Sequence, residues 1–185
     1  MGPFYILELP VGESTLLQLW LRGGFPGSYL AGNDTASLRW RIDFIRTYLE
    51  RDVPQFGPRV PAAVLDRLWT MLAHGQGTLL NASRLAAGLQ ISAPSVHRYI
   101  DLLVDLLLVR RLLPFHRNTG KRLVKSPKVY VRDSGMLHAL LNVSDVNALI
   151  GHPITVSIVQ DRFWQFHVTG SIDLAISIIK RIQPP

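Results

Sequence analysis

The 185-residue chain contains no cysteine, which excludes disulfides, zinc sites with thiolate ligands and cysteine nucleophiles. It also lacks an apolar run of the roughly 18 residues that a membrane-spanning helix needs, because Arg, Asp or Gly interrupts each run. The N-terminus, MGPFYILELP, has no basic region followed by an apolar core, so it does not resemble a secretory signal. His116 and His152 have no second ligand at metal spacing. These absences predict a cytoplasmic protein without a bound metal.

Hydrophobic residues make up 48% of the chain, which is enough to fill a core and excludes intrinsic disorder. The net charge is +7 at pH 7, and such an excess favours polyanionic partners. Nine of the 20 Lys and Arg residues lie between His97 and Arg132, against only Asp101 and Asp105. On charge alone, nucleic acid and an anionic membrane surface both fit. We expect nucleic acid and no membrane partner.

The pattern predicts a mainly α fold with a small β component (α+β). After a short strand within residues 1–12, apolar periodicity predicts helices over 13–22 and 35–53. The apolar face of the second includes Ile42 and Ile45, with Arg41 among its polar residues. Three more helices are expected over 62–73, 83–91 and 94–107, and two strands over 108–114 and 128–133, joined by a basic loop over 115–127.

This order indicates three domains. Residues 1–57 form an N-terminal, helical, lid-like segment, because the Pro- and Gly-rich QFGPRVP marks a boundary near residue 58. Residues 58–142 form a winged helix-turn-helix, in which Gln90 to Pro94 makes the turn and Pro94 lies in the first turn of the third helix. Residues 143–185 form a truncated α/β tail.

In a helix-turn-helix, the exposed N-terminal residues of the third helix meet the major groove. Here they are Ser95, His97, Arg98 and, one turn later, Asp101. Phosphate contacts are expected from the basic residues of the wing, namely Arg117, Lys121, Arg122, Lys125 and Lys128. The alternative is that these charges belong to a solvated loop or to a surface that docks onto other protein.

Several phrases resemble a known family. LWLRGGFPGSYLA, WRIDFIRTYLERDVPQFG and LPFHRNTGKRLVKSPKVYVRDSGMLHALLNV are similar to the C-terminal half of bacterial and archaeal AAA-like ATPases that carry a DUF4143 domain. The likeness covers roughly residues 4 to 153. It implies a winged helix followed by a restriction-endonuclease-like fold, with residues 1 to about 55 as the remnant of the ATPase part.

The chain departs from that family at both ends. No G-x-x-x-x-G-K-[ST] occurs, and the nearest approach, at Thr119 to Arg122, has Phe115 where the first glycine should be. Nucleotide binding is therefore not expected. Asp173 and Lys180 would match the metal-binding carboxylate and the lysine of the nuclease-like core, but Ser171 stands where another carboxylate belongs. Because metal-dependent cleavage needs clustered carboxylates, we expect these positions to be degenerate.

These observations predict a non-catalytic fragment, without a cofactor, that binds DNA through its winged helix. The alternative is a protein-interaction module that docks onto an ATPase partner or associates with itself. A metal-dependent nuclease is the least favoured reading.

Overall fold

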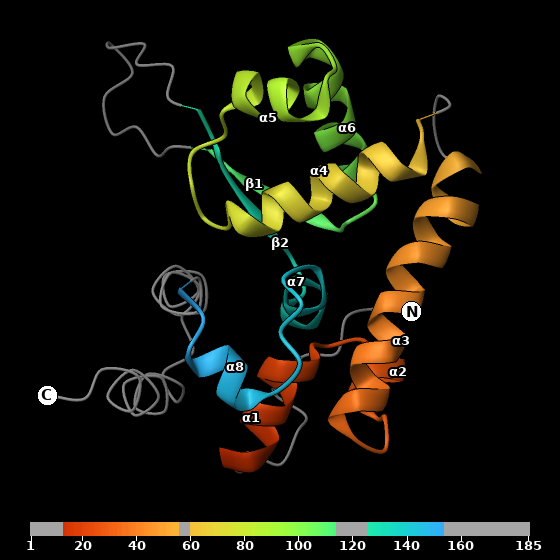
Figure 1. Ribbon diagram of the computed structural model, residues 1–185, viewed down its shortest axis with the longest axis vertical. Helices are drawn as coiled ribbons and strands as arrows, with labels where there is room; N and C mark the ends of the chain where they lie inside the picture. Colours follow the sequence, from red (N-terminus) through yellow and green to blue (C-terminus); the bar gives the residue numbers. More distant parts are fainter. Residues whose placement is uncertain (1–12, 56–59, 114–125, 154–185) are drawn as a thin grey trace, which may run out of the picture. The chain divides into compact units, whose positions relative to one another are not determined.

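The computed structural model describes residues 13–55, 60–113 and 126–153, which Figure 1 colours along the chain. The described part is mainly helical with one small antiparallel sheet, as the sequence predicts. The chain divides by compactness into a first unit, residues 1–42 with 133–185, and a second unit, residues 43–132. The predicted domain boundaries at 57 and 142 stay predictions. The strand expected within residues 1–12 lies outside the described residues, as do most of the basic loop and of the tail.

The described part of the first unit is helical. It contains α1 (Glu13–Arg22), α2 (Pro26–Tyr29), the first turns of α3 (Asp34–Thr47), α7 (Ser134–Leu140) and α8 (Val146–Ile150). Helix α1 packs mainly against α7. Buried Leu21, Val143 and Leu149 form an apolar cluster to which Trp20 also contributes. This core therefore joins two segments that are more than a hundred residues apart in sequence.

A tight contact explains Gly23, the first residue after α1. Gly23 has φ +78°, and a Cβ there would lie only 2.3 Å from Oδ1 of Asp133. The N–H of Gly24 donates to Oδ2 of the same carboxylate at 2.7 Å. Asp133 also caps α7, because its Oδ1 accepts from the N–H of Met136 at 2.8 Å. One carboxylate thus ties the end of α1 to the start of α7.

The second unit begins with an irregular helix end. After Thr47, α3 gives way to η2 (Tyr48–Asp52), a π-helical turn, and then to η3 (Val53–Gln55), a 3-10 turn. The N–H of Val53 bonds to the carbonyl of Tyr48, five residues earlier. The sequence predicts one helix up to residue 53. The change of helix type precedes Pro54, which has no N–H to continue an α-helix.

Three helices follow close to their predicted positions, and Figure 1 shows them beside the sheet. They are α4 (Ala62–His74), α5 (Ala82–Leu89) and α6 (Ala93–Asp105). Local capping sets two of their starts, because Asn81 Oδ1 accepts from the N–H of Arg84 and Ser92 Oγ accepts from the N–H of Ser95. Their apolar faces meet in a core whose side chains have no exposed surface: Leu65, Leu68, Trp69, Val96, Ile100 and Leu103.

The sheet pairs β1 (Val109–Leu112) with β2 (Lys128–Val131) in antiparallel register, Val109 opposite Val131 and Leu112 opposite Lys128. A further segment, residues 77–80, runs along the other side of β2. Leu79 forms a bridge to Lys128, and the N–H of Leu80 donates to the carbonyl of Pro127 at 2.8 Å. The sequence does not predict this third segment, because it is too short to show alternation.

The side chain of Gln76 extends the same ladder. Its Oε1 accepts from the N–H of Val131 at 2.8 Å, and its Nε2 donates to the carbonyl of Val131 at 3.3 Å. The amide therefore occupies the place that a strand backbone would take beside β2. Gln76 is only 6% exposed, so these bonds are shielded from water.

Candidate nucleic-acid interface

Helix α6 presents the side chains that the sequence predicts to face a partner. Its buried face points into the core of the second unit, whereas His97 and Arg98 are exposed and Ser95 is half-buried. Nη2 of Arg98 donates to Oγ of Ser95 at 3.0 Å, and the Ser95 hydroxyl lies 2.9 Å from that of Ser92. These contacts hold the guanidinium of Arg98 beside the first turn of α6.

An open depression of about 530 Å³ lies beside this turn. Three segments contribute to it: the residues that lead into α5, the exposed His97 of α6, and the residues just before β2. Among the residues that the structure describes, no carboxylate lines it. The lining residues are Leu79, Leu80, Asn81, Ala82, Ser83, His97, Ser126 and Pro127.

The charge on the exposed side of α6 changes along the helix. His97 lies near its start, and Asp101 and Asp105 follow at intervals of one turn. Asp101 forms an ion pair with Arg111 of β1, whereas no ion pair of Asp105 occurs among the described residues. The N-terminal half of this face is therefore compatible with phosphate, and the C-terminal half carries acids.

Of the residues predicted to contact phosphate from the basic loop, the structure describes one, at the start of β2. Lys128 is half-buried at the start of β2, between Leu79 and Leu112 of the neighbouring segments. The other predicted phosphate contacts, Arg117, Lys121, Arg122 and Lys125, lie outside the described residues. The same holds for Asp173 and Lys180.

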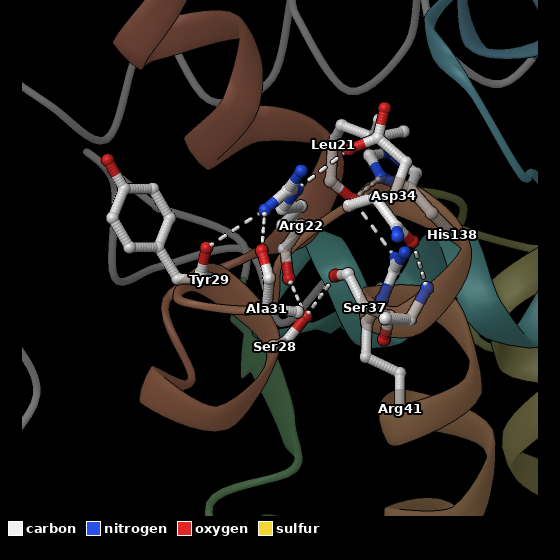
Figure 2. A network of polar contacts seen from close by, with 11 residues as sticks. Leu21, Arg22, Ser28, Tyr29, Ala31, Asp34, Ser37, Arg41 and His138 are labelled. Atoms are coloured by element: carbon white, nitrogen blue, oxygen red, sulfur yellow. Dashed lines mark hydrogen bonds and ion pairs between the residues drawn. The ribbon is translucent and has the colours of Figure 1, made fainter.

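The first unit contains a polar cluster that the sequence did not predict (Figure 2). Arg41 is fully buried, and its Nη1 donates to the carbonyls of Leu21 at 3.0 Å and Gly135 at 2.8 Å. Burial lowers the pKa of Arg41 below its ordinary value, while the nearby carboxylates of Asp133 and Asp34 oppose that shift. The sequence contains one signal for this burial. Arg41 lies four residues before Ile45, which is buried, and a helix places residues four apart on the same face.

A second arginine completes the cluster. Nε of Arg22 pairs with Oδ1 of Asp34 at 2.7 Å, and its Nη1 donates to the carbonyls of Tyr29 and Ala31. The hydroxyl of Ser28 donates to the carbonyl of Arg22 at 2.6 Å. These donors are engaged by one carboxylate and by backbone carbonyls. Nη2 of Arg41 is also buried and has no hydrogen-bond partner in the described part of the chain. The other contacts of the cluster hold the chain turns of the first unit together.

The described residues meet the requirements of neither a metal site nor a membrane-spanning helix. In residues 13–55, 60–113 and 126–153, no group of three or more His, Cys, Asp or Glu side chains is placed to hold a metal ion. Among the described helices, none has the length and apolar character needed to cross a bilayer.

A family model described as a domain of unknown function (DUF8612) matches residues 13–147. The chain belongs to this family. The DUF8612 match includes both the first unit's cluster and the described face of α6, whereas Asp173 and Lys180 lie beyond it.

Two mycobacterial proteins are similar to this DUF8612 chain, the uncharacterized proteins Mb2031c of Mycobacterium bovis and Rv2008c of Mycobacterium tuberculosis. Each is 48% identical over 143 residues, which cover 77% of this chain and 32% of the relative. The chain thus spans about a third of the length of these relatives. No solved structure matches it.

The expected relationship to DUF4143-bearing ATPases is wrong, because the family that matches is DUF8612. The prediction that residues 1 to about 55 are the remnant of an AAA-like ATPase rested on that relationship and is also wrong. Neither the family's description nor the names of the mycobacterial relatives assign a function. A function for this DUF8612 chain must therefore be argued from its own residues.

Proposed function

We propose that the second unit is a winged helix-turn-helix that binds duplex DNA with little sequence preference. In this proposal the N-terminal half of α6 enters the major groove, and the loop between β1 and β2 lies along the phosphate backbone.

The order of elements supports the proposal. Helix α4 is followed by the strand-like segment 77–80, then by α5 and α6, and then by β1 and β2. Segment 77–80 and β1 flank β2 on its two sides. Three helices followed by a small sheet are the order expected of a winged helix-turn-helix, and in that motif the later helix of the helix-turn-helix is the one that meets DNA.

The exposed start of α6 is the observation that carries the proposal. His97 lines a depression to which no described carboxylate contributes, and Arg98, the next residue, is exposed. The N-terminus of a helix itself favours negative charge. Asp105, farther along the same helix and without an ion pair among the described residues, would repel phosphate. This gradient favours one docking orientation, with the N-terminal end of α6 toward DNA.

A titration of the full chain with a duplex of arbitrary sequence tests the proposal. Each phosphate contact adds about −0.9 to the slope of log K against log salt, so four contacts would weaken binding roughly 100-fold between about 50 and 200 mM salt. Absence of binding at the lower salt concentration would refute the proposal.

A pair of arginine variants localises the contact. Arg98→Ala should weaken binding roughly 5- to 20-fold, because it removes a cation from the proposed groove face. Arg46→Ala removes the same charge from an exposed position on α3 and should change affinity less than about 2-fold. Equal losses in the two variants would show that only net charge matters.

Protein docking is a second candidate function, favoured by exposed leucines at the base of the wing. Leu79, Leu112 and Leu113 are 57%, 39% and 74% exposed, and the first two flank Lys128 in one row across the sheet. Sedimentation of the full chain and of a Leu113→Asp variant tests self-association. A dimer that dissociates in the variant would favour docking, and a monomer in both would count against self-association through this surface.

A further inference from the structure

One ion pair on the proposed interface joins α6 to the sheet. Nη2 of Arg111 in β1 donates to Oδ1 of Asp101 in α6. The side chains remain 28% and 50% exposed, so solvent and solutes reach both partners. Ion pairs with this much exposure hold their partners only weakly. A competing anion can therefore displace the carboxylate from Arg111.

The position of the pair places Arg111 near the predicted DNA contacts. Asp101 follows His97 by one helical turn, which is about 6 Å along the axis of α6. Rotation of a long arginine side chain covers such a distance. A phosphate bound beside His97 would thus lie within range of the guanidinium that Asp101 now holds.

We propose that Asp101 restrains DNA binding by occupying Arg111. The carboxylate of Asp101 and a backbone phosphate compete for one guanidinium, so the protein binds DNA with one cation fewer than its sequence offers. The inference rests on the proposed DNA-binding function and adds an internal regulator to it. Asp101 would then limit non-specific affinity, because phosphate contacts supply most of that affinity.

Asp105 provides a matched control. It lies one turn beyond Asp101, is exposed, and has no ion pair among the described residues. Asp105→Asn removes the same charge from the same helix without releasing a cation. It should raise affinity slightly and leave the salt slope unchanged.

The experiment compares the full-length wild-type protein, Asp101→Asn and Asp105→Asn in DNA titrations at several salt concentrations. Asp101→Asn should steepen the salt slope by about 0.9, because Arg111 gains a phosphate contact, and should bind roughly 3- to 10-fold more tightly than Asp105→Asn at low salt. Adding Arg111→Gln to Asp101→Asn should return the slope to the wild-type value. If Asp101→Asn folds poorly, Asp101→Ser serves the same purpose.

The outcomes separate the two proposals. Wild-type protein that binds DNA, together with equal slopes for Asp101→Asn and Asp105→Asn, overturns the restraint and leaves the DNA-binding function standing. Weaker binding by a folded Asp101→Asn also overturns it, because the pair would then position α6 for DNA. Wild-type protein that binds no DNA overturns the proposed function, and the restraint with it.

Discussion

The pairing of the Gln76 side chain with β2 leads to a sharp prediction. Gln76→Leu keeps a side chain of similar size but removes both the acceptor and the donor that face Val131. The N–H and the carbonyl of Val131 are then left without these partners in a buried place. Each such loss costs about 1 to 3 kcal/mol, and the gain from burying the leucine offsets part of it. We expect the free energy of unfolding to fall by about 2 kcal/mol.

Urea denaturation followed by circular dichroism measures this loss. With a denaturant dependence of about 1 to 3 kcal/mol per molar urea, the midpoint should fall by about 1 M. Hydrogen exchange adds a local readout, because the amide of Val131 should exchange faster in Gln76→Leu than in the wild-type protein.

Gln55→Leu is the control, because Gln55 is exposed and makes one bond, from Nε2 to the carbonyl of Arg51. It should change the free energy of unfolding by less than about 0.5 kcal/mol. A similarly small change in Gln76→Leu would refute the reasoning, since the buried amide would then contribute nothing beyond its volume.

Two further predictions concern the first unit. Gly135→Ala should lower the free energy of unfolding by about 2 kcal/mol, because a Cβ there would lie 2.1 Å from the carbonyl oxygen of Arg22. Gly32→Ala, where a Cβ meets nothing within 4 Å, should be nearly neutral, and equal shifts of the two thermal midpoints would contradict this. The N–H of Ala148 and the hydroxyl of Ser144 hold the pKa of Asp145 below its ordinary value, so its stabilising effect is present above the ordinary pKa and is lost as the pH falls through the folded-state pKa. The difference in urea midpoint between wild type and Asp145→Asn should therefore shrink as the pH falls below the ordinary carboxyl pKa of about 4, and a constant difference would argue against this coupling.

Local signals predicted much of the second unit. Asn81 and Pro94 mark the starts of α5 and α6 because capping and proline preferences act over a few residues. The ion pair of Arg22 with Asp34 is also short-range, since the two residues lie only twelve positions apart. The two strands followed from short apolar runs on either side of a basic loop.

The candidate site was predictable only in part. The exposure of His97 and Arg98 follows from the apolar periodicity of α6. The pairing of Asp101 with Arg111 did not, because it depends on how β1 crosses that helix. The family resemblance was misleading, since shared phrases indicated DUF4143 whereas the match is to DUF8612.

Within α3, the apolar periodicity and the structure disagree about which side chains are buried. Ile42 is 46% exposed, although the pattern placed it on the apolar face, while the neighbouring Arg41 is fully buried. The carbonyls of Leu21 and Gly135 make that burial tolerable, because they receive the hydrogen bonds that water would otherwise accept.

The sequence by itself determined α1, the start of α3, α4, α5 and α6, the two paired strands and the concentration of positive charge, because each depends on neighbours within a few turns of chain. Tertiary structure decided which polar groups are buried: Arg41 against α1 and α7, and Gln76 against β2. It also decided that Asp101 holds Arg111. These contacts join residues that are distant in sequence or lie on different elements. Their hydrogen bonds offset the cost of removing the polar groups from water, and no local pattern records that balance.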